Sequence, residues 1–157
     1  MTIAEKIAND CGEAWIPEIY ASKVRSQRTR SYSLDLPERL NRVDILHTLL
    51  GIEIKAANRR IASPDYSTAR YIRTFARLGC REFAIPYDIS RISTIADELE
   101  AAWHRTMLLI NEHMKGKSVQ AVGRARGAVI RAMRTEIYEA GAGPKMPKFD
   151  RPTKQRK

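Results

Sequence analysis

Apolar side chains recur at helical spacing along most of this chain of 157 residues, and this periodicity constrains its fold more than any other feature. Residues three and four positions apart share one face of an α-helix, so apolar residues at such steps form a stripe that must be buried. The longest stripe comprises Leu40, Val43, His47, Leu50, Ile54, Ala57 and Ile61. We therefore predict one continuous helix from about Asp35, with Pro37 in its first turn, to Ile61.

Helix caps and glycines delimit further helices on both sides of this stripe. Thr2 and Glu5 have the spacing of a capping box, Ser118 can cap the last helix, and Gly141 can end it. The five main helices are expected over residues 2–12, 35–61, 64–78, 88–116 and 118–141, with a shorter helical piece at 17–24. Residues 25–33 are predicted to be a loop, and 81–87 a linker that can hold a short extended piece.

These elements predict an all-α, single-domain bundle of about five helices over residues 1–141. Residues 142–157 differ in composition, because Pro144, Pro147 and Pro152 stand among lysines and arginines. Such a segment cannot build a core, so we expect a basic tail that is disordered when free.

Positive charge is segregated along the chain. Its formal net charge is +10, from 28 Lys and Arg against 18 Asp and Glu. Residues 22–33 and 115–134 contain four and six basic side chains and no acid, and residues 141–157 contain six with one acid. The rest of the chain is therefore net negative. Like charges repel, and a large, clustered positive charge is typical of proteins that bind a polyanion.

We expect this polyanion to be nucleic acid rather than a membrane surface. No apolar run is long enough to span a bilayer, and no signal peptide follows Met1. The most basic helix opposes its arginines with Ala, Val, Ile and Met, whereas membrane-surface helices use Trp, Phe and Leu. Cys11 and Cys80 form no CxxC pattern, which indicates two buried thiols in a reducing compartment. A cytoplasmic protein without metal or cofactor is predicted.

Three arginines follow each other at helical spacing in the segment 64–78, and we call Arg70, Arg73 and Arg77 the arginine ridge. Arg81 continues it if the helix passes Gly79. Like charges on adjacent turns are unfavourable, and a phosphate backbone would supply the missing anion. The alternative is pairing with acids of a neighbouring helix. Those acids are Asp97, Glu98 and Glu100.

Two other basic segments are candidates for phosphate contact. The last helix carries Arg124, Arg126, Arg131 and Arg134. Gly123 and Gly127 interrupt it at a cost of about 1 kcal/mol each relative to Ala, which indicates close approach of another helix or of a nucleic-acid backbone. The predicted loop carries Lys23, Arg25, Arg28 and Arg30, with Tyr32 available to stack on a base. No sequence-reading motif accompanies them, so contact with the backbone is expected.

One short motif suggests an enzyme instead. Asp44 followed by Glu53 and Lys55 resembles the metal site of PD-(D/E)xK nucleases, in which two acids bind Mg²⁺ and orient a water molecule. The motif covers about a dozen residues, and Val43 replaces the proline that precedes the first acid. On one continuous helix the two acids would lie on opposite faces, whereas a β-hairpin would bring them together. The predicted helix therefore favours a protein that is not an enzyme.

The arginine ridge, the basic helix and the all-helical frame together resemble the small subunits of CRISPR effector complexes, including those of type I-D systems. The resemblance spans the chain and implies a non-catalytic role in antiviral defence. It implies several copies that line a guide-RNA filament, beside other protein subunits of the ribonucleoprotein, and that hold target or displaced DNA by its backbone. The basic tail and the Glu53–Lys55 pair are not explained by it. A helical adaptor that binds an acidic protein remains another alternative.

Overall fold

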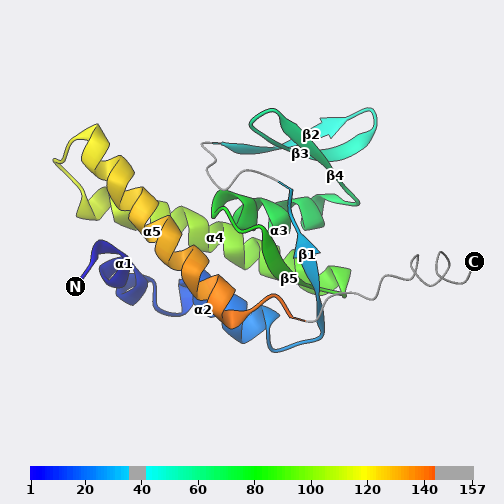
Figure 1. The fold of residues 1–157 in the computed structure, drawn as a ribbon, viewed down its shortest axis with the longest axis horizontal. Helices are drawn as coiled ribbons and strands as arrows, with labels where there is room; N and C mark the ends of the chain where they lie inside the picture. Colours follow the sequence, from blue (N-terminus) through cyan, green and yellow to red (C-terminus); the bar gives the residue numbers. More distant parts are fainter. Residues whose placement is uncertain (36–41, 144–157) are drawn as a thin grey trace, which may run out of the picture.

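The chain folds into a mixed α/β structure, and the prediction of an all-α bundle is wrong (Figure 1). The computed structural model describes residues 1–35 and 42–143, so the tail predicted at 142–157 lies almost wholly outside the described residues, as does Pro37. The helices are α1 (Ile3–Cys11), α2 (Ile16–Ile19), α3 (Tyr66–Arg77), α4 (Ile89–His113) and α5 (Val119–Ala140). A 3₁₀ turn (Gly12–Ala14) and a π-helical segment (Tyr20–Val24) flank α2. The strands are β1 (Thr29–Ser33), β2 (Val43–Thr48), β3 (Gly51–Ala56), β4 (Arg59–Ser63) and β5 (Glu82–Pro86).

The longest predicted helix is replaced by the antiparallel meander β2–β3–β4. Val43 lies opposite Ala56, and Ile54 lies between Ile45 and Ile61 on one face. This face is buried against α3, because Ile54 and Ala56 are completely shielded from solvent. Val43, His47, Ile54 and Ile61 of the predicted stripe lie on one face of the meander, whereas Leu50 and Ala57 lie in its turns. Strand residues and turn residues together therefore produced the steps of three and four that are typical of a helix.

Two-residue turns join the strands of the meander. Leu49 and Leu50 form the first, in which the Thr48 hydroxyl accepts a hydrogen bond from the Leu50 amide at 3.1 Å. Both leucines are fully exposed. Gly51, with φ of 118°, opens β3 in a conformation that other residues rarely adopt. The sequence lacks an Asn-Gly or Asp-Gly dipeptide here, and so this turn carries no conventional signal.

The other strands form a separate two-stranded ribbon. β1 pairs with β5 in antiparallel register, from Thr29 opposite Pro86 to Ser33 opposite Glu82. The loop predicted over residues 25–33 is therefore wrong in its second half, because a strand partner about 50 residues away organises it. The extended piece expected within residues 81–87 is confirmed as β5.

The remaining helices agree with the prediction. Thr2 and Glu5 form the capping box of α1, and the Ser118 hydroxyl accepts a hydrogen bond from the Ala121 amide at the start of α5. α3 is capped by Asp65, and α4 by Asp88. These ends were predictable because capping interactions are local in the chain.

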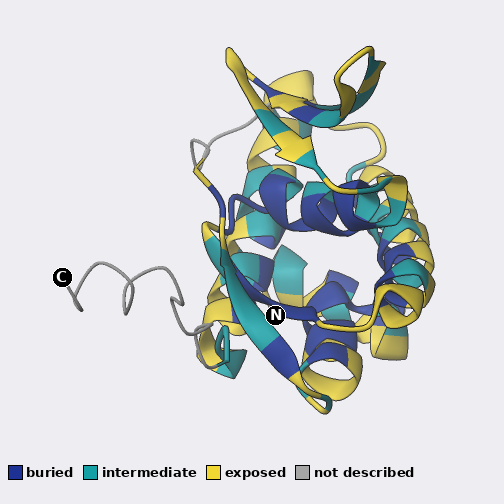
Figure 2. Cartoon of the chain, turned by 90° about the vertical axis from the view of Figure 1, so that its right-hand side faces the viewer, coloured by how far each residue is buried: buried dark blue, intermediate teal, exposed yellow. Residues whose placement is uncertain are grey.

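α3 lies between the meander and α4, and α5 crosses α4 (Figure 1). α1 and α2 contact both α4 and α5. The buried faces of these elements turn toward one another (Figure 2). The core contains the buried aromatic side chains of Tyr20, Tyr71, Phe75 and Phe83. Phe75 and Phe83 stack with ring centroids 4.4 Å apart, which ties α3 to β5.

Candidate nucleic-acid interface

Two members of the arginine ridge form ion pairs inside the molecule. Arg70 donates to Glu100 through Nε at 3.1 Å and through Nη2 at 2.9 Å, and it also pairs with Asp97. Arg73 pairs with the other carboxylate oxygen of Glu100. The hydrogen bonds that Arg70 donates to Glu100 are the main reason that the pKa of Arg70 is raised. The alternative of pairing with acids of α4 therefore holds for these two residues.

Glu100 is the centre of this ion-pair network. Partial burial alone would raise the pKa of its carboxyl, but hydrogen bonds from Arg70 and Arg73 outweigh the burial and lower it. Both arginines are only 13% and 21% exposed at the side chain, so water does not screen the network fully. The repulsion between Arg70 and Arg73 is thus relieved without an external anion.

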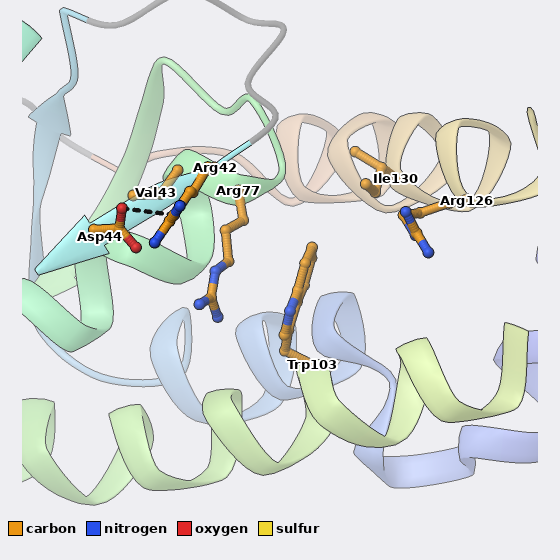
Figure 3. A pocket seen from close by; sticks show the side chains of 7 residues that line it. All are labelled: Arg42, Val43, Asp44, Arg77, Trp103, Arg126 and Ile130. Atoms are coloured by element: carbon orange, nitrogen blue, oxygen red, sulfur yellow. Dashed lines mark ion pairs between the residues drawn. The ribbon is translucent and has the colours of Figure 1, made fainter. Parts of the chain in front are cut away.

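Arg77, the third member of the ridge, has a different environment. Its guanidinium lies over the Trp103 ring, 5.3 Å from the centroid, and makes no ion pair or hydrogen bond within the described residues. Burial and the nearby Arg73 lower the pKa of Arg77, as expected for an incompletely compensated cation. It lines a cavity of about 260 Å³ between β2, α3, α4 and α5, which we call the Arg77 pocket (Figure 3). The lining residues are Arg42, Val43, Asp44, Arg77, Trp103, Arg126 and Ile130.

The basic residues of α5 are divided between two sides of the helix. Ala125, Val129, Met133 and Ile137 form its buried face. Arg124 and Arg131 are seven residues apart, so they lie on one outward face, and both are exposed. Neither forms an ion pair with any acid in the part of the chain that the structure describes. Arg126, about 200° around the helix from Arg124, lines the Arg77 pocket.

The glycines of α5 have no packing role within the described structure. A Cβ atom added at Gly123 would meet nothing within 4 Å, and one added at Gly127 would meet only Nη1 of Arg131, at 3.2 Å. Close approach of a neighbouring helix, one of the two explanations given for these glycines, is therefore wrong for the described residues. The outward face of α5 carries two exposed arginines beside backbone that is open to an approaching molecule.

The basic residues of the predicted loop contact other parts of the molecule. Lys23 pairs with Glu98, and Arg25 donates to the carbonyl oxygen of Ala140 at 3.1 Å. Arg28 lies over the Tyr87 ring, and Arg30 over the Tyr32 ring at 6.0 Å. Arg81 does not continue the arginine ridge, because α3 ends at Arg77; it directly precedes β5, and its side chain is exposed. Arg134 is half-buried and donates to the carbonyl oxygen of Leu78 at 3.3 Å.

The meander places the residues of the nuclease motif on one face. Asp44 lies directly opposite Lys55, and Glu53 is two residues from Lys55 on the same strand. Cross-strand partners and alternate residues share a face, so the three side chains are neighbours. Asp44 pairs with Arg42 at 2.9 Å and Glu53 with Arg60 at 3.4 Å. The prediction that the two acids lie on opposite faces of a helix is therefore wrong.

Sequence reasoning missed two residues of the Arg77 pocket. Arg42 was placed within the helix predicted over residues 35–61, and Trp103 within the helix predicted over residues 88–116, and neither was a candidate for binding. A half-buried arginine beside a tryptophan from another helix leaves no local pattern, because the contact joins residues 26 positions apart.

Comparison of the chain with protein-family models, with curated proteins and with solved structures gave no match. Among the described residues, none of the helices combines the length and the apolar character that a bilayer crossing requires. Those residues also contain no group of three or more His, Cys, Asp and Glu side chains that could hold a metal ion.

Proposed function

We propose that this protein binds the phosphates of a nucleic-acid backbone, with the outward face of α5 as the principal contact surface. The observation that carries this proposal is the pairing state of the basic residues. Arg70, Arg73 and Lys23 have carboxylate partners, whereas the exposed Arg124 and Arg131 have none in the described part of the chain. These two guanidinium groups lie about two turns apart on one face, roughly 10.5 Å along the helix axis, and each is suited to a separate phosphate of one backbone.

The open glycines support the same surface. Gly123 and Gly127 lower the helix propensity of α5, and neither is needed for packing within the described structure. A phosphate backbone that approaches the helix closely gives such residues a function. Binding of this kind depends on charge rather than on base identity, so strong salt dependence and weak sequence preference are expected.

The proposal does not extend to a particular assembly. The resemblance to CRISPR small subunits depended partly on an all-helical frame and on the arginine ridge. The chain contains five strands in its described part, and two ridge arginines are paired internally. Membership of such a complex stays a prediction, as does the adaptor that binds an acidic protein.

Salt titrations of binding to short labelled single-stranded DNA, duplex DNA and RNA test the proposal. We expect affinity to fall steeply with salt, and the double variant Arg124→Gln/Arg131→Gln to reduce the duplex-DNA slope by about one to two units. The matched control, Lys6→Gln/Arg91→Gln, removes two exposed cations from α1 and α4 and should leave the slope nearly unchanged. Equal losses in both variants would indicate diffuse charge instead of a site.

A second candidate function, a Mg²⁺-dependent nuclease, is favoured by the register of the meander. Asp44, Glu53 and Lys55 share a face there, as the motif requires. Carboxylate oxygens are suitable ligands for Mg²⁺, although both acids would first have to leave their arginine partners. The bound ion would supply Lewis-acid chemistry, and Lys55 would supply a positive charge beside it.

Cleavage assays separate the two functions. A nuclease would degrade DNA or RNA in Mg²⁺, and Glu53→Gln and Lys55→Gln would each abolish cleavage while preserving affinity. Glu112→Gln, at an exposed position of α4, is the control for removal of one acidic charge. Activity that persists in Glu53→Gln would exclude this site as its source.

A further inference from the structure

The Arg77 pocket brings together side chains from four elements that are distant in sequence. Asp44 comes from β2 and Arg42 from just before it, Arg77 from the end of α3, Trp103 from α4 and Arg126 from α5. Arg77 and Arg126 lie on opposite sides of Trp103 in the view of Figure 3. Its volume of about 260 Å³ is enough for a small polar ligand.

The charges around this pocket do not cancel. The lining contains three guanidinium groups and a single carboxylate. That carboxylate, of Asp44, is already paired with Arg42 at 2.9 Å. Arg77 and Arg126 remain without an ion-pair partner in the described residues, which leaves a local charge of about +2. The indole of Trp103 supplies a flat apolar wall beside them.

Arg77 is the residue whose environment most requires a ligand. Partial burial removes water from its guanidinium, and its only described partner is the Trp103 ring. A cation–π contact offsets only part of the cost of a desolvated cation that makes no hydrogen bonds. A bound anion would provide both the charge and the acceptor oxygens that the described residues do not supply to Arg77.

We propose that the Arg77 pocket binds a phosphate monoester, such as the terminal phosphate of a nucleic acid or the phosphate of a mononucleotide. A monoester carries about −1.5 to −2 charges at neutral pH, which matches Arg77 and Arg126, whereas an internal diester carries only one. An end group can also enter a pocket that two flanking sugars would obstruct. This site is separate from the outward face of α5, so either proposal can fail without the other.

Fluorescence and calorimetric titrations of the full chain test the pocket. The probes are inorganic phosphate, a mononucleotide 5′-phosphate, and one oligonucleotide prepared with a 5′-phosphate and with a 5′-hydroxyl. We expect the phosphorylated oligonucleotide to bind about tenfold more tightly than the hydroxyl form, equivalent to about 1.4 kcal/mol. Trp103 emission should change with every phosphate monoester, and Trp103→Phe should remove that change.

Two variants of α5 distinguish the pocket from the outward face. Arg126→Gln should bring the phosphate-to-hydroxyl affinity ratio close to one, whereas Arg124→Gln should weaken both oligonucleotides and leave the ratio unchanged. Arg77→Gln should act like Arg126→Gln, provided that circular dichroism shows a folded chain. A wild-type ratio near one together with no response to inorganic phosphate or to the mononucleotide would overturn the proposal. A ratio that survives in Arg126→Gln would overturn it too.

Discussion

At the scale of single residues, arginines that occupy helices of the same chain have different environments. Arg70 and Arg73 are held by Glu100, Arg77 lies against Trp103, and Arg124 projects from the surface. Helical spacing placed the first three on one face correctly. Glu100, the acid that pairs with both Arg70 and Arg73, is on another helix and at least 27 residues away in sequence.

Replacing Glu100 tests whether the ridge is structural. Glu100→Gln should destabilise the fold at neutral pH by about 1–3 kcal/mol, because half-buried guanidinium groups lose their anionic partner. Since folding lowers the pKa of Glu100, its contribution is present above its ordinary pKa and disappears as pH falls through the lower, folded value. Urea denaturation should therefore show the two proteins converging in acid.

The control for this measurement is Glu112→Gln, an exposed acid on the same helix that makes no ion pair with another described residue. It should change stability by less than about 0.5 kcal/mol. A stability difference between wild type and Glu100→Gln that widens on acidification would contradict the network.

At the scale of secondary structure, the meander decides which leucines and isoleucines are buried. The predicted helix would bury Leu50 and Ile54 on one stripe. The meander buries Ile54 completely and leaves Leu50 92% exposed in a turn. The helix and the meander therefore predict different losses of unfolding free energy when Leu50 or Ile54 is shortened to alanine.

Alanine substitutions at these two positions distinguish the folds. Ile54→Ala should cost about 2–4 kcal/mol because it leaves a cavity between the meander and α3. Leu50→Ala should cost less than about 0.5 kcal/mol, since its side chain contacts mainly solvent. Chemical denaturation measures both, and comparable losses would favour the helix.

A glycine of α5 separates stability from binding. Gly123→Ala should stabilise the protein by about 0.5–1 kcal/mol, because alanine is the better helix former and its Cβ meets nothing within 4 Å. The same substitution should weaken nucleic-acid binding if a backbone lies close to this turn. Thermal melts and the salt titration described above measure the two effects on one variant. A more stable protein with unchanged affinity would place the nucleic acid elsewhere on the surface.

At the scale of the whole molecule, the N-terminal helical segment holds the ribbon and the last helix together. The buried hydroxyl of Tyr20 accepts a hydrogen bond from the Ala84 amide at 2.8 Å and donates to the carbonyl oxygen of Gly141 at 2.6 Å. It thus connects the π-helical segment, β5 and the end of α5 through one atom. The indole of Trp15 adds a second connection to α5, by donating to Glu136 at 2.9 Å.

Removing the Tyr20 hydroxyl should weaken this connection. Tyr20→Phe leaves the Ala84 amide buried without an acceptor, and we expect a loss of about 1–3 kcal/mol in unfolding free energy. Tyr138→Phe is the matched control, because its hydroxyl bonds the exposed Arg81 amide and should contribute less. Hydrogen exchange should accelerate at Ala84 in the first variant only. Unchanged protection there would show that the hydroxyl is dispensable.

The amino-acid sequence by itself determined the local features of this protein. The caps of α1 and α5, the helical spacing of the ridge and the segregation of charge all arise between residues a few positions apart, where short-range geometry decides. Only the tertiary structure decided the pairing of β1 with β5, the conversion of residues 42–63 into a meander, and which arginines are neutralised. These outcomes depend on partners distant in sequence, and a local pattern cannot encode the contacts that such partners make.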